Sequence, residues 1–332
     1  MAIDCEAHQS NTTIDKSFIV YDNNEELDYT YCHFKFEEVR PKNFVDMLCI
    51  ENKKLKCKSD FKLTLTDLNY LKKKDDIESI DLNMNMIICI NKLDLDQFNS
   101  LTELFLANNF IEKISPNTFE NLINLKTLNL SHNLIQRIDE KTFLNLRNLY
   151  DLNLSNNRIE YIHMLAFKDN TKLIYLHLNN NILKPDYCYG FPYLQHLIYL
   201  NLSFNYLNYI SKFTFYRLKN LKVLLLNNNC IEYIDKDSFV NCESIDLIFL
   251  HSNKLYNIKS SSFKFEKLNN QCVITLFFNN LKTRMVDKSL RNNEKLKLVL
   301  DNEEIKEYIK SDNFRRLNKF LDRQQFADFY IK

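Results

Sequence analysis

Glycine is nearly absent from this chain of 332 residues: Gly190 is the only one, and there are only four prolines. Globular proteins average roughly 7% glycine. A phosphate-binding P-loop, a dinucleotide-binding fingerprint and the nucleophile elbow of a serine hydrolase each need two or more glycines, where the backbone turns tightly or approaches a ligand. The sequence therefore excludes these three frameworks, together with collagen-like and glycine-rich linker structures.

A surplus of charge and long apolar runs are also missing. The 44 Lys and Arg residues balance 43 Asp and Glu residues, which leaves a formal charge of +1. Nucleic-acid binding needs an excess of positive charge on one face, so we expect no nucleic-acid partner. No apolar run approaches the roughly 18 residues that cross a membrane, so we expect no membrane insertion. The first ten residues lack the basic and apolar regions of a signal peptide.

Leucine, in contrast, recurs at a fixed interval of 24 residues. One complete copy contains Leu101, Leu104, Leu106, Asn109 and Ile111, and further copies open at Leu125, Leu149, Leu173, Leu197 and Leu221. A second column keeps the same spacing and consists of Leu95, Phe119, Phe143, Phe167, Phe191, Phe215, Phe239 and Phe263. After a two-residue insertion the pattern resumes, so that about ten units cover residues 77–320.

These motifs resemble the leucine-rich repeat family, specifically its extracellular type with 24 residues per repeat. The resemblance implies an α/β-class solenoid shaped like a horseshoe, β-dominated, with a parallel concave sheet of about ten coils. The Leu-x-Leu segment alternates with the period of a strand, which turns every second residue inward. The repeated Asn can satisfy the backbone of the following turn, and the Phe column predicts a second internal spine.

Both ends of such a solenoid need caps, because each coil buries its apolar face only against its neighbours. Residues 1–76 do not fit the repeat and are predicted to form a cysteine-containing N-terminal cap, followed by the solenoid over 77–320 and a tail over 321–332 that completes the C-terminal cap. Within the N-terminal cap, residues 61–71 alternate like a strand that could pair with the edge of the first coil. Residues 305–332 place apolar side chains at a roughly helical spacing, which predicts a segment that seals the last coil or, alternatively, docks onto a second chain.

The nine cysteines favour an oxidising compartment when they are taken together with the cap and the repeat type, so we expect a secreted or extracellular protein. The disulfide candidates, of open connectivity, are Cys32, Cys49, Cys57, Cys89, Cys242 and Cys272, whereas Cys5, Cys188 and Cys230 have no assigned partner. No zinc-like spacing occurs, and we expect no metal and no cofactor. Asn11 is the glycosylation candidate, and the sequons at Asn129, Asn153 and Asn201 are left open because they also fit the strand pattern.

The residues between the inward leucines are predicted to form a solvent-facing concave surface. The early coils present polar side chains there, and the character changes at the fifth coil. The predicted partner-binding residues are Tyr175, His177, Tyr199, Phe204, Val223, Leu225, Leu247, Phe249, Val273, Phe277 and Phe278. An exposed apolar patch of this reach, about 20 Å along the sheet, usually marks an interface. Self-association, cover by the C-terminal tail and tolerated exposure are the alternatives. His177 and His251 are expected to be surface residues.

No acid–base pair stands out in a recognisable pocket, so we expect a protein that is not an enzyme. The resemblance extends to Toll ectodomains and the leucine-rich immune proteins of mosquitoes. It implies a secreted recognition module that binds a protein or peptide partner through its concave face, with a role in innate immunity. Two alternatives are a secreted effector or venom-type protein that binds a host target, and a self-associating extracellular structural protein.

Overall fold

The computed structural model describes residues 48–51, 53–57, 74–184, 191, 193–265, 267–281 and 286–301, with the backbone alone for 48–51, 56, 57 and 75. The chain divides into two compact units, Met1–Glu37 and Glu38–Lys332, and every described residue belongs to the second. Within the described residues, no helix is long and apolar enough to cross a lipid bilayer.

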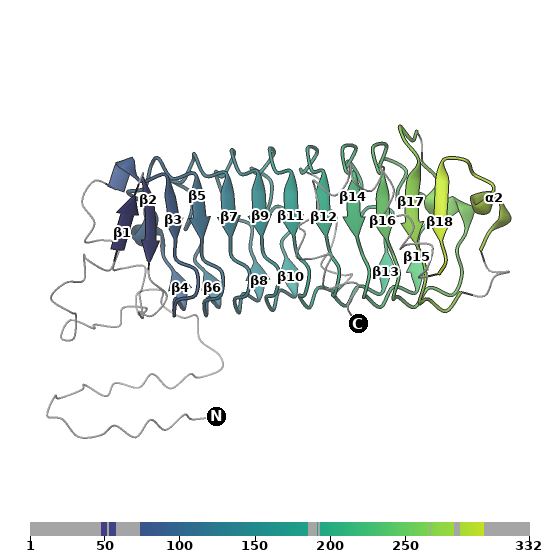
Figure 1. Ribbon diagram of the computed structural model, residues 1–332, viewed down its shortest axis with the longest axis horizontal. Coiled ribbons are helices and arrows are strands. Elements are labelled where there is room, and N and C mark those ends of the chain that lie inside the picture. The colour runs from purple at the N-terminus through teal and green to yellow at the C-terminus, as the bar shows by residue number, and fades with distance from the viewer. Residues whose placement is uncertain are drawn as a thin grey trace, which may run out of the picture. The chain divides into compact units, whose positions relative to one another are not determined.

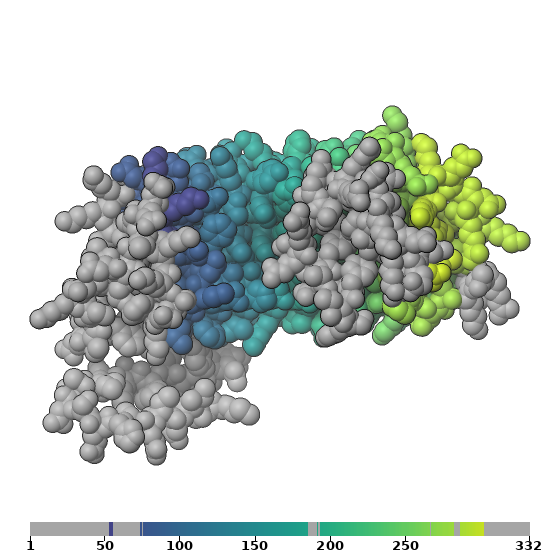
Figure 2. All heavy atoms as spheres, in the orientation of Figure 1, coloured from purple at the N-terminus to yellow at the C-terminus, as the bar shows by residue number. Residues whose placement is uncertain are grey.

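One row of short strands forms the main sheet (Figure 1). It begins with an antiparallel hairpin of β1 (Leu48–Glu51) and β2 (Lys54–Cys57). Ten parallel strands follow in the described residues: β3 (Ser79–Asp81), β5 (Glu103–Phe105), β7 (Thr127–Asn129), β9 (Asp151–Asn153), β11 (Tyr175–His177), β12 (Tyr199–Asn201), β14 (Val223–Leu225), β16 (Leu247–Phe249), β17 (Cys272–Thr275) and β18 (Leu296–Val299). Each strand pairs with the next at equivalent repeat positions, as in Leu104 opposite Leu128, so the predicted parallel solenoid is confirmed. The described coils follow one another in chain order (Figure 2).

The rest of each coil contains little regular structure. Two-residue strands pair across neighbouring coils: β4 (Cys89–Ile90) with β6 (Lys113–Ile114), β8 (Arg137–Ile138) with β10 (Tyr161–Ile162), and β13 (Tyr209–Ile210) with β15 (Tyr233–Ile234). The described helices are single turns: α1 (Lys92–Leu95), α2 (Lys288–Arg291), and the 3₁₀ segments η4 (Lys74–Asp76) and η6 (Ser260–Phe263). The fold is therefore β-dominated, as predicted.

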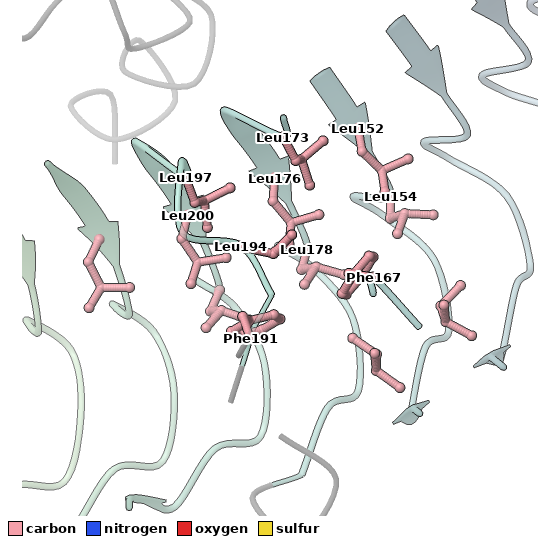
Figure 3. Packing of buried hydrophobic residues seen from close by; sticks show 14 of the residues in the cluster. Leu152, Leu154, Phe167, Leu173, Leu176, Leu178, Phe191, Leu194, Leu197 and Leu200 are labelled. Atoms are coloured by element: carbon pink, nitrogen blue, oxygen red, sulfur yellow. The ribbon is translucent and has the colours of Figure 1, made fainter. Parts of the chain in front are cut away.

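Two apolar columns fill the interior of the coils. The leucines of the strands point inward and pack against those of the adjacent coils (Figure 3). The Phe column is buried throughout, and its rings stack at centroid distances of 6.3 Å for Phe119–Phe143, 5.9 Å for Phe143–Phe167 and 5.3 Å for Phe239–Phe263. This confirms the second spine, which closes each coil on the side away from the main sheet.

A ladder of buried asparagines ties each coil to the one before it. Asn157 Nδ2 donates to the carbonyl oxygen of Leu130 at 2.9 Å in the preceding coil and to that of Leu154 at 3.1 Å in its own. Its Oδ1 accepts from the backbone N–H of Ile135 at 3.1 Å. Asn109, Asn133, Asn181, Asn205, Asn229 and Asn253 repeat the arrangement. The ladder satisfies turn groups that would otherwise be buried without partners.

The same turns explain the scarcity of glycine. The residue before each ladder asparagine has a positive φ between 53° and 56°, a conformation that favours Gly or Asn. Asn fills this turn position in four coils, as Asn108, Asn156, Asn180 and Asn228. The solenoid therefore turns without glycine, because asparagine tolerates the left-handed region better than other residues do.

The edge of the first coil is closed differently from the prediction. Strand β3 pairs with β2 on one side and with β5 on the other. The predicted pairing of residues 61–71 with this edge is therefore wrong, because both hydrogen-bonding sides of β3 are taken. Residues 61–71 themselves lie outside the described residues, as does the predicted tail over 321–332, and the boundary at residue 76 stays a prediction.

No disulfide links Cys242 and Cys272, two of the candidates whose connectivity the sequence left open. Cys242 and Cys272 are buried free thiols, and burial raises the pKa of Cys242 to about 12 and that of Cys272 well above its usual range. Cys230 is a half-buried free thiol. Cys5, Cys32 and Cys188 lie outside the described residues, as does Asn11. Only the backbone of Cys49 and Cys57 is described, and Cys89 lies on β4, so the cap disulfides stay a prediction.

Candidate partner-binding surface

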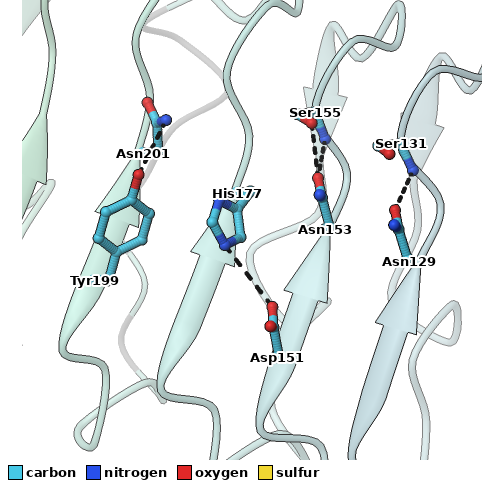
Figure 4. Close-up of polar contacts among 8 residues, drawn as sticks. All are labelled: Asn129, Ser131, Asp151, Asn153, Ser155, His177, Tyr199 and Asn201. Atoms are coloured by element: carbon cyan, nitrogen blue, oxygen red, sulfur yellow. Dashed lines mark hydrogen bonds and ion pairs between the residues drawn. The ribbon is translucent and has the colours of Figure 1, made fainter. Parts of the chain in front are cut away.

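The outward face of the main sheet has two parts that differ in chemistry and exposure. Outward side chains come from the first and third residue of each three-residue strand, since the middle residue points into the core (Figure 4). On β5, β7, β9 and β11 these side chains are half-buried, and we call them the polar outward half: Glu103, Phe105, Thr127, Asn129, Asp151, Asn153, Tyr175 and His177.

A carboxylate and an imidazole meet on this half (Figure 4). Asp151 Oδ1 lies 3.8 Å from His177 Nε2 on the neighbouring strand, and the His177 ring lies 5.0 Å from that of Tyr199. The sequence analysis did not join Asp151 with His177, although the parallel register places them diagonally across two strands. Tyr150, which it also missed, is half-exposed and packs edge-on against Tyr175 at 5.4 Å between centroids.

Loss of water changes how these groups titrate. Desolvation raises the pKa of Asp151 to about 6, and desolvation together with the hydrogen bond to Tyr150 raises that of Tyr175 to about 12. Asp151 is therefore mostly ionised at pH 7 and can attract a cationic or hydrogen-bond-donating group of a partner. Within the described residues, no group of three or more metal-ligating side chains comes together.

The second part of the face is not solvent-facing, and this overturns a prediction. Tyr199, Val223, Leu225, Leu247, Phe249, Val273 and Phe277 were predicted to be exposed, yet all are buried. With Val299 they form a second hydrophobic cluster, separate from the solenoid core, which we call the apolar outward cluster. The expectation failed because it assumed an open face over every strand.

Matched residues show that the sheet alone does not cause this burial. Asn129, Asn153 and Asn201 occupy the same position on β7, β9 and β12, but the first two are half-buried and Asn201 is only 3% exposed. Tyr175 and Tyr199 are also equivalent, and only Tyr199 is fully buried. The change falls between β11 and β12, within an otherwise regular sheet.

His251 is likewise not the surface residue that was expected. It is 3% exposed, its Nδ1 lies 2.8 Å from Thr275 Oγ1, and its ring stacks on that of Phe277 at 4.4 Å. Desolvation lowers its pKa to about 3. His251 is therefore a neutral member of the buried outward layer at physiological pH.

Two predicted residues stay exposed on the turns beside the cluster. Phe204 and Phe278 are 45% and 68% exposed and have φ values of 55° and 53° at the turn position where other coils use Asn. A bulky residue with positive φ is a strained choice that an Asn would avoid. Tyr206, two residues after Phe204, is also exposed and was missed by the sequence analysis. These three residues form the turn aromatics.

The buried position of Asn201 predicts that this residue is not glycosylated in the folded protein. Its Nδ2 donates to the Tyr199 hydroxyl at 3.3 Å (Figure 4). Its Oδ1 accepts from the Ser203 hydroxyl at 2.7 Å. A glycan on Nδ2 would need room that a 3%-exposed side chain does not have. When the chain is expressed as a secreted protein in a eukaryotic cell, we expect folded molecules to carry no glycan at Asn201. Site-specific glycopeptide mass spectrometry checks this, and high occupancy at Asn201 would contradict the buried position.

The regular coils, their asparagine ladder and their paired strands define a leucine-rich-repeat solenoid. The leucine rich repeat family model matches residues 99–159, 147–198 and 195–255. The matched stretch, residues 99–255, is a run of leucine-rich repeats, and the fold of the described coils agrees with the resemblance drawn from the sequence. No curated protein matches the chain.

Solved structures share this fold. A chain from the Toll–Spatzle complex, described as a molecular hub in Drosophila development and innate immunity, is 24% identical with a TM-score of 0.55, over 64% of this chain and 29% of that one. Its glycosylated form gives 21% and 0.57, over 69% and 33%. A chain of the octameric complex of Latrophilin 3, Unc5D and FLRT2 (LRR) is 18% identical with a TM-score of 0.61, over 78% and 94%. The chain thus spans a third or less of the chain it matches in the Toll–Spatzle complex.

Proposed function

We propose that this chain is an extracellular recognition protein that binds a protein or peptide partner through the outward face of its main sheet. The supporting observation is a face that stays half-exposed over four coils and combines aromatic, acidic and amide groups. The similar folds in the Toll–Spatzle and FLRT2 complexes are found with protein partners, which supports a protein ligand. An immune setting and a non-enzymatic role form part of the proposal.

The binding site that we propose is centred on Tyr175 and His177 and continues to the turn aromatics. Tyr175 brings a ring supported by Tyr150, and His177 with Asp151 brings a polar pair that can fix the orientation of a partner. Aromatic residues supply much of the binding energy where they are found in interfaces. Phe204 and Phe278 add apolar area at strained turns, a cost that partner contact would offset.

The test uses substitutions that remove these aromatic groups and keep the turns. Phe204→Asn and Phe278→Asn introduce the residue that equivalent turns use, so we expect the melting temperature to stay level or rise. Together with Tyr175→Ala they should weaken partner capture at least tenfold, because each lost aromatic anchor typically costs about 1–2 kcal/mol or more. The measurement is chemical crosslinking of the tagged chain to secreted proteins of its own source, quantified by mass spectrometry.

Ser252→Asn is the matched control, since Ser252 occupies the same turn position with a φ of 55°. This variant should capture the wild-type partners at wild-type levels. If the triple variant does so as well, with its fold intact by circular dichroism, the assignment of the binding face is wrong.

A further inference from the structure

The polar outward half contains a carboxylate whose charge is poorly compensated by its neighbours. Asp151 opens β9, and its side chain is 38% exposed. Its Oδ1 lies 3.8 Å from His177 Nε2 (Figure 4), which is longer than the limit of about 3.2 Å for an ordinary hydrogen bond. Among the described residues, no further ion pair and no side-chain hydrogen bond reaches this carboxylate. Asp151 is therefore accessible and only weakly paired.

Asp246 shows how a similar carboxylate is compensated elsewhere on the sheet. It is half-buried beside β16, and desolvation raises its pKa, as it raises that of Asp151. Asn270 Nδ2, however, donates to Asp246 Oδ1 at 2.9 Å, and this hydrogen bond and the positive charge of Lys222 both lower the pKa again. No such contribution offsets the desolvation of Asp151. A desolvated carboxylate of this kind gains free energy when a cation pairs with it.

Two tyrosine rings stand beside this carboxylate. Tyr175 lies directly opposite Asp151 in the parallel register, so the two Cα atoms are about 4.8 Å apart. Tyr150 precedes Asp151 in the chain, and its ring meets that of Tyr175 at 5.4 Å between centroids and at 65°. Tyr175 is partly buried, whereas Tyr150 is 47% exposed and offers ring surface to an incoming group. Negative charge and aromatic surface are thus available at one place.

This combination suits a guanidinium group better than other cations. The guanidinium is planar, donates two parallel hydrogen bonds to a carboxylate and stacks on aromatic rings. An ammonium group is a compact, strongly hydrated charge that cannot form the same planar contacts. The chain contains an internal example of the arrangement. The Arg137 guanidinium lies 4.2 Å from the centroid of the Tyr161 ring on the neighbouring coil, and its Nη2 lies 3.8 Å from Asp139 Oδ1.

We propose that Tyr150, Asp151 and Tyr175 form a site for an arginine side chain of the partner, which we call the arginine site. The guanidinium pairs with the Asp151 carboxylate and packs on the tyrosine rings, and His177 borders the site on β11. The inference rests on the proposed function, because a partner must bring the arginine. It narrows that partner to a protein or peptide with an exposed arginine.

Titration of the full chain with three short peptides at constant ionic strength tests the arginine site. The peptides are acetylated and amidated Gly-Arg-Gly, Gly-Lys-Gly and Gly-citrulline-Gly, of which the last keeps the shape of arginine without its charge. NMR of isotope-labelled tyrosine rings follows Tyr150 and Tyr175, whose signals are assigned with single Tyr→Phe variants. We expect the arginine peptide to shift both signals saturably, and the citrulline and lysine peptides to bind more weakly, by roughly tenfold and a few fold respectively.

Three variants divide the contributions of charge and ring. Asp151→Asn removes the charge and keeps the side-chain shape, so it should weaken binding of the arginine peptide roughly tenfold. Asp246→Asn is the matched control and should keep the wild-type affinity, because it removes a half-buried carboxylate that Asn270 already serves. Tyr150→Leu changes a half-exposed position and should weaken binding a few fold, about the value of a cation–π contact. Circular dichroism checks the fold of each variant.

The arginine site is refuted if the arginine peptide gives no saturable shift, if the citrulline or lysine peptide binds equally well, or if Asp151→Asn or Tyr150→Leu keeps the wild-type affinity. If Asp151→Asn does not fold, Tyr150→Leu and the citrulline peptide decide.

These measurements use no natural partner, so they fail separately from the proposed function. Peptide binding together with undiminished partner capture by the triple variant would keep the arginine site and refute the binding face. Lost capture without peptide binding would keep the face and refute the arginine site.

Discussion

Asn157→Ala should lower the free energy of unfolding by about 3 kcal/mol, because the side chain bridges two coils from a buried position. The loss can be traced group by group. The Leu130 and Leu154 carbonyls keep bonds from Asn133 and Asn181, but the Ile135 N–H loses the acceptor that Asn157 Oδ1 provides. A buried donor without a partner costs about 1–3 kcal/mol, and the loss of the bonds that Nδ2 donates adds about 1 kcal/mol, because their acceptors keep other donors.

Equilibrium urea denaturation followed by circular dichroism measures this effect, and calorimetry should show a melting temperature lower by roughly 6–12 °C. Asn124→Ala is the matched control, since the exposed Asn124 donates one bond to the Asn99 carbonyl at 2.9 Å. Its effect should stay below about 1 kcal/mol. An Asn157→Ala protein within that same margin of wild type would mean that the ladder contributes little to stability.

The regular part of this fold was predictable because its information is local and repeated. The 24-residue interval placed Leu104 opposite Leu128 and stacked Phe119 on Phe143, and the structure confirms both arrangements. The ladder role of Asn157 followed from the same pattern. The repeat also explains why glycine is scarce, since Asn occupies the turn position of positive φ in four coils.

The candidate site was predicted less well, because exposure depends on contacts between distant parts of the chain. Val223 and Leu247 lie on the outward face, as their strand positions indicated, yet they are buried. Strand periodicity states which face a side chain belongs to, but it does not state what lies on that face. Phe204 and Phe278 are exposed because they lie on the turns that follow β12 and β17, outside the face of the sheet.

The pairing of Asp151 with His177 could have been predicted once the register was assumed. In a parallel sheet with equivalent positions side by side, a residue at the first position of one strand lies diagonally from the third position of the next. Tyr150 had no comparable signal, because the residue before a strand follows neither the inward nor the outward alternation. The sequence therefore failed to predict two things: the burial of outward side chains such as Val223 and Leu247, and the role of Tyr150, which lies outside the regular strand.

His251 should make this protein lose stability in acid. Its pKa falls from an ordinary 6.5 to about 3 on folding, so the unfolded chain binds a proton between these values that the folded chain does not. Stability contributed by the neutral imidazole is thus complete above pH 6.5 and is lost progressively as the pH falls toward 3. With about 1.4 kcal/mol per pH unit, the loss amounts to about 2 kcal/mol at pH 5 and at most about 5 kcal/mol near pH 3.

Urea denaturation at pH 7, 6, 5 and 4 measures this dependence, and His251→Asn isolates it. Asp151 and Asp246 titrate in the opposite sense, because burial raises the pKa of both carboxyls and folding then gains from acid. The difference between wild type and variant removes these contributions. Only the slope counts, since loss of the stacking on Phe277 lowers the stability of the variant at every pH.

His132→Asn is the control for removal of a histidine, because His132 is exposed and occupies a turn position that suits Asn. It should keep the wild-type profile, while His251→Asn should flatten the profile between pH 6.5 and 4. Parallel slopes for all three proteins would refute the buried neutral state of His251. Since His251 stacks within the outward layer beside Phe249 and Phe277, its protonation opposes the packing of the apolar outward cluster. Acid should therefore loosen that cluster before it unfolds the ladder-bound coils.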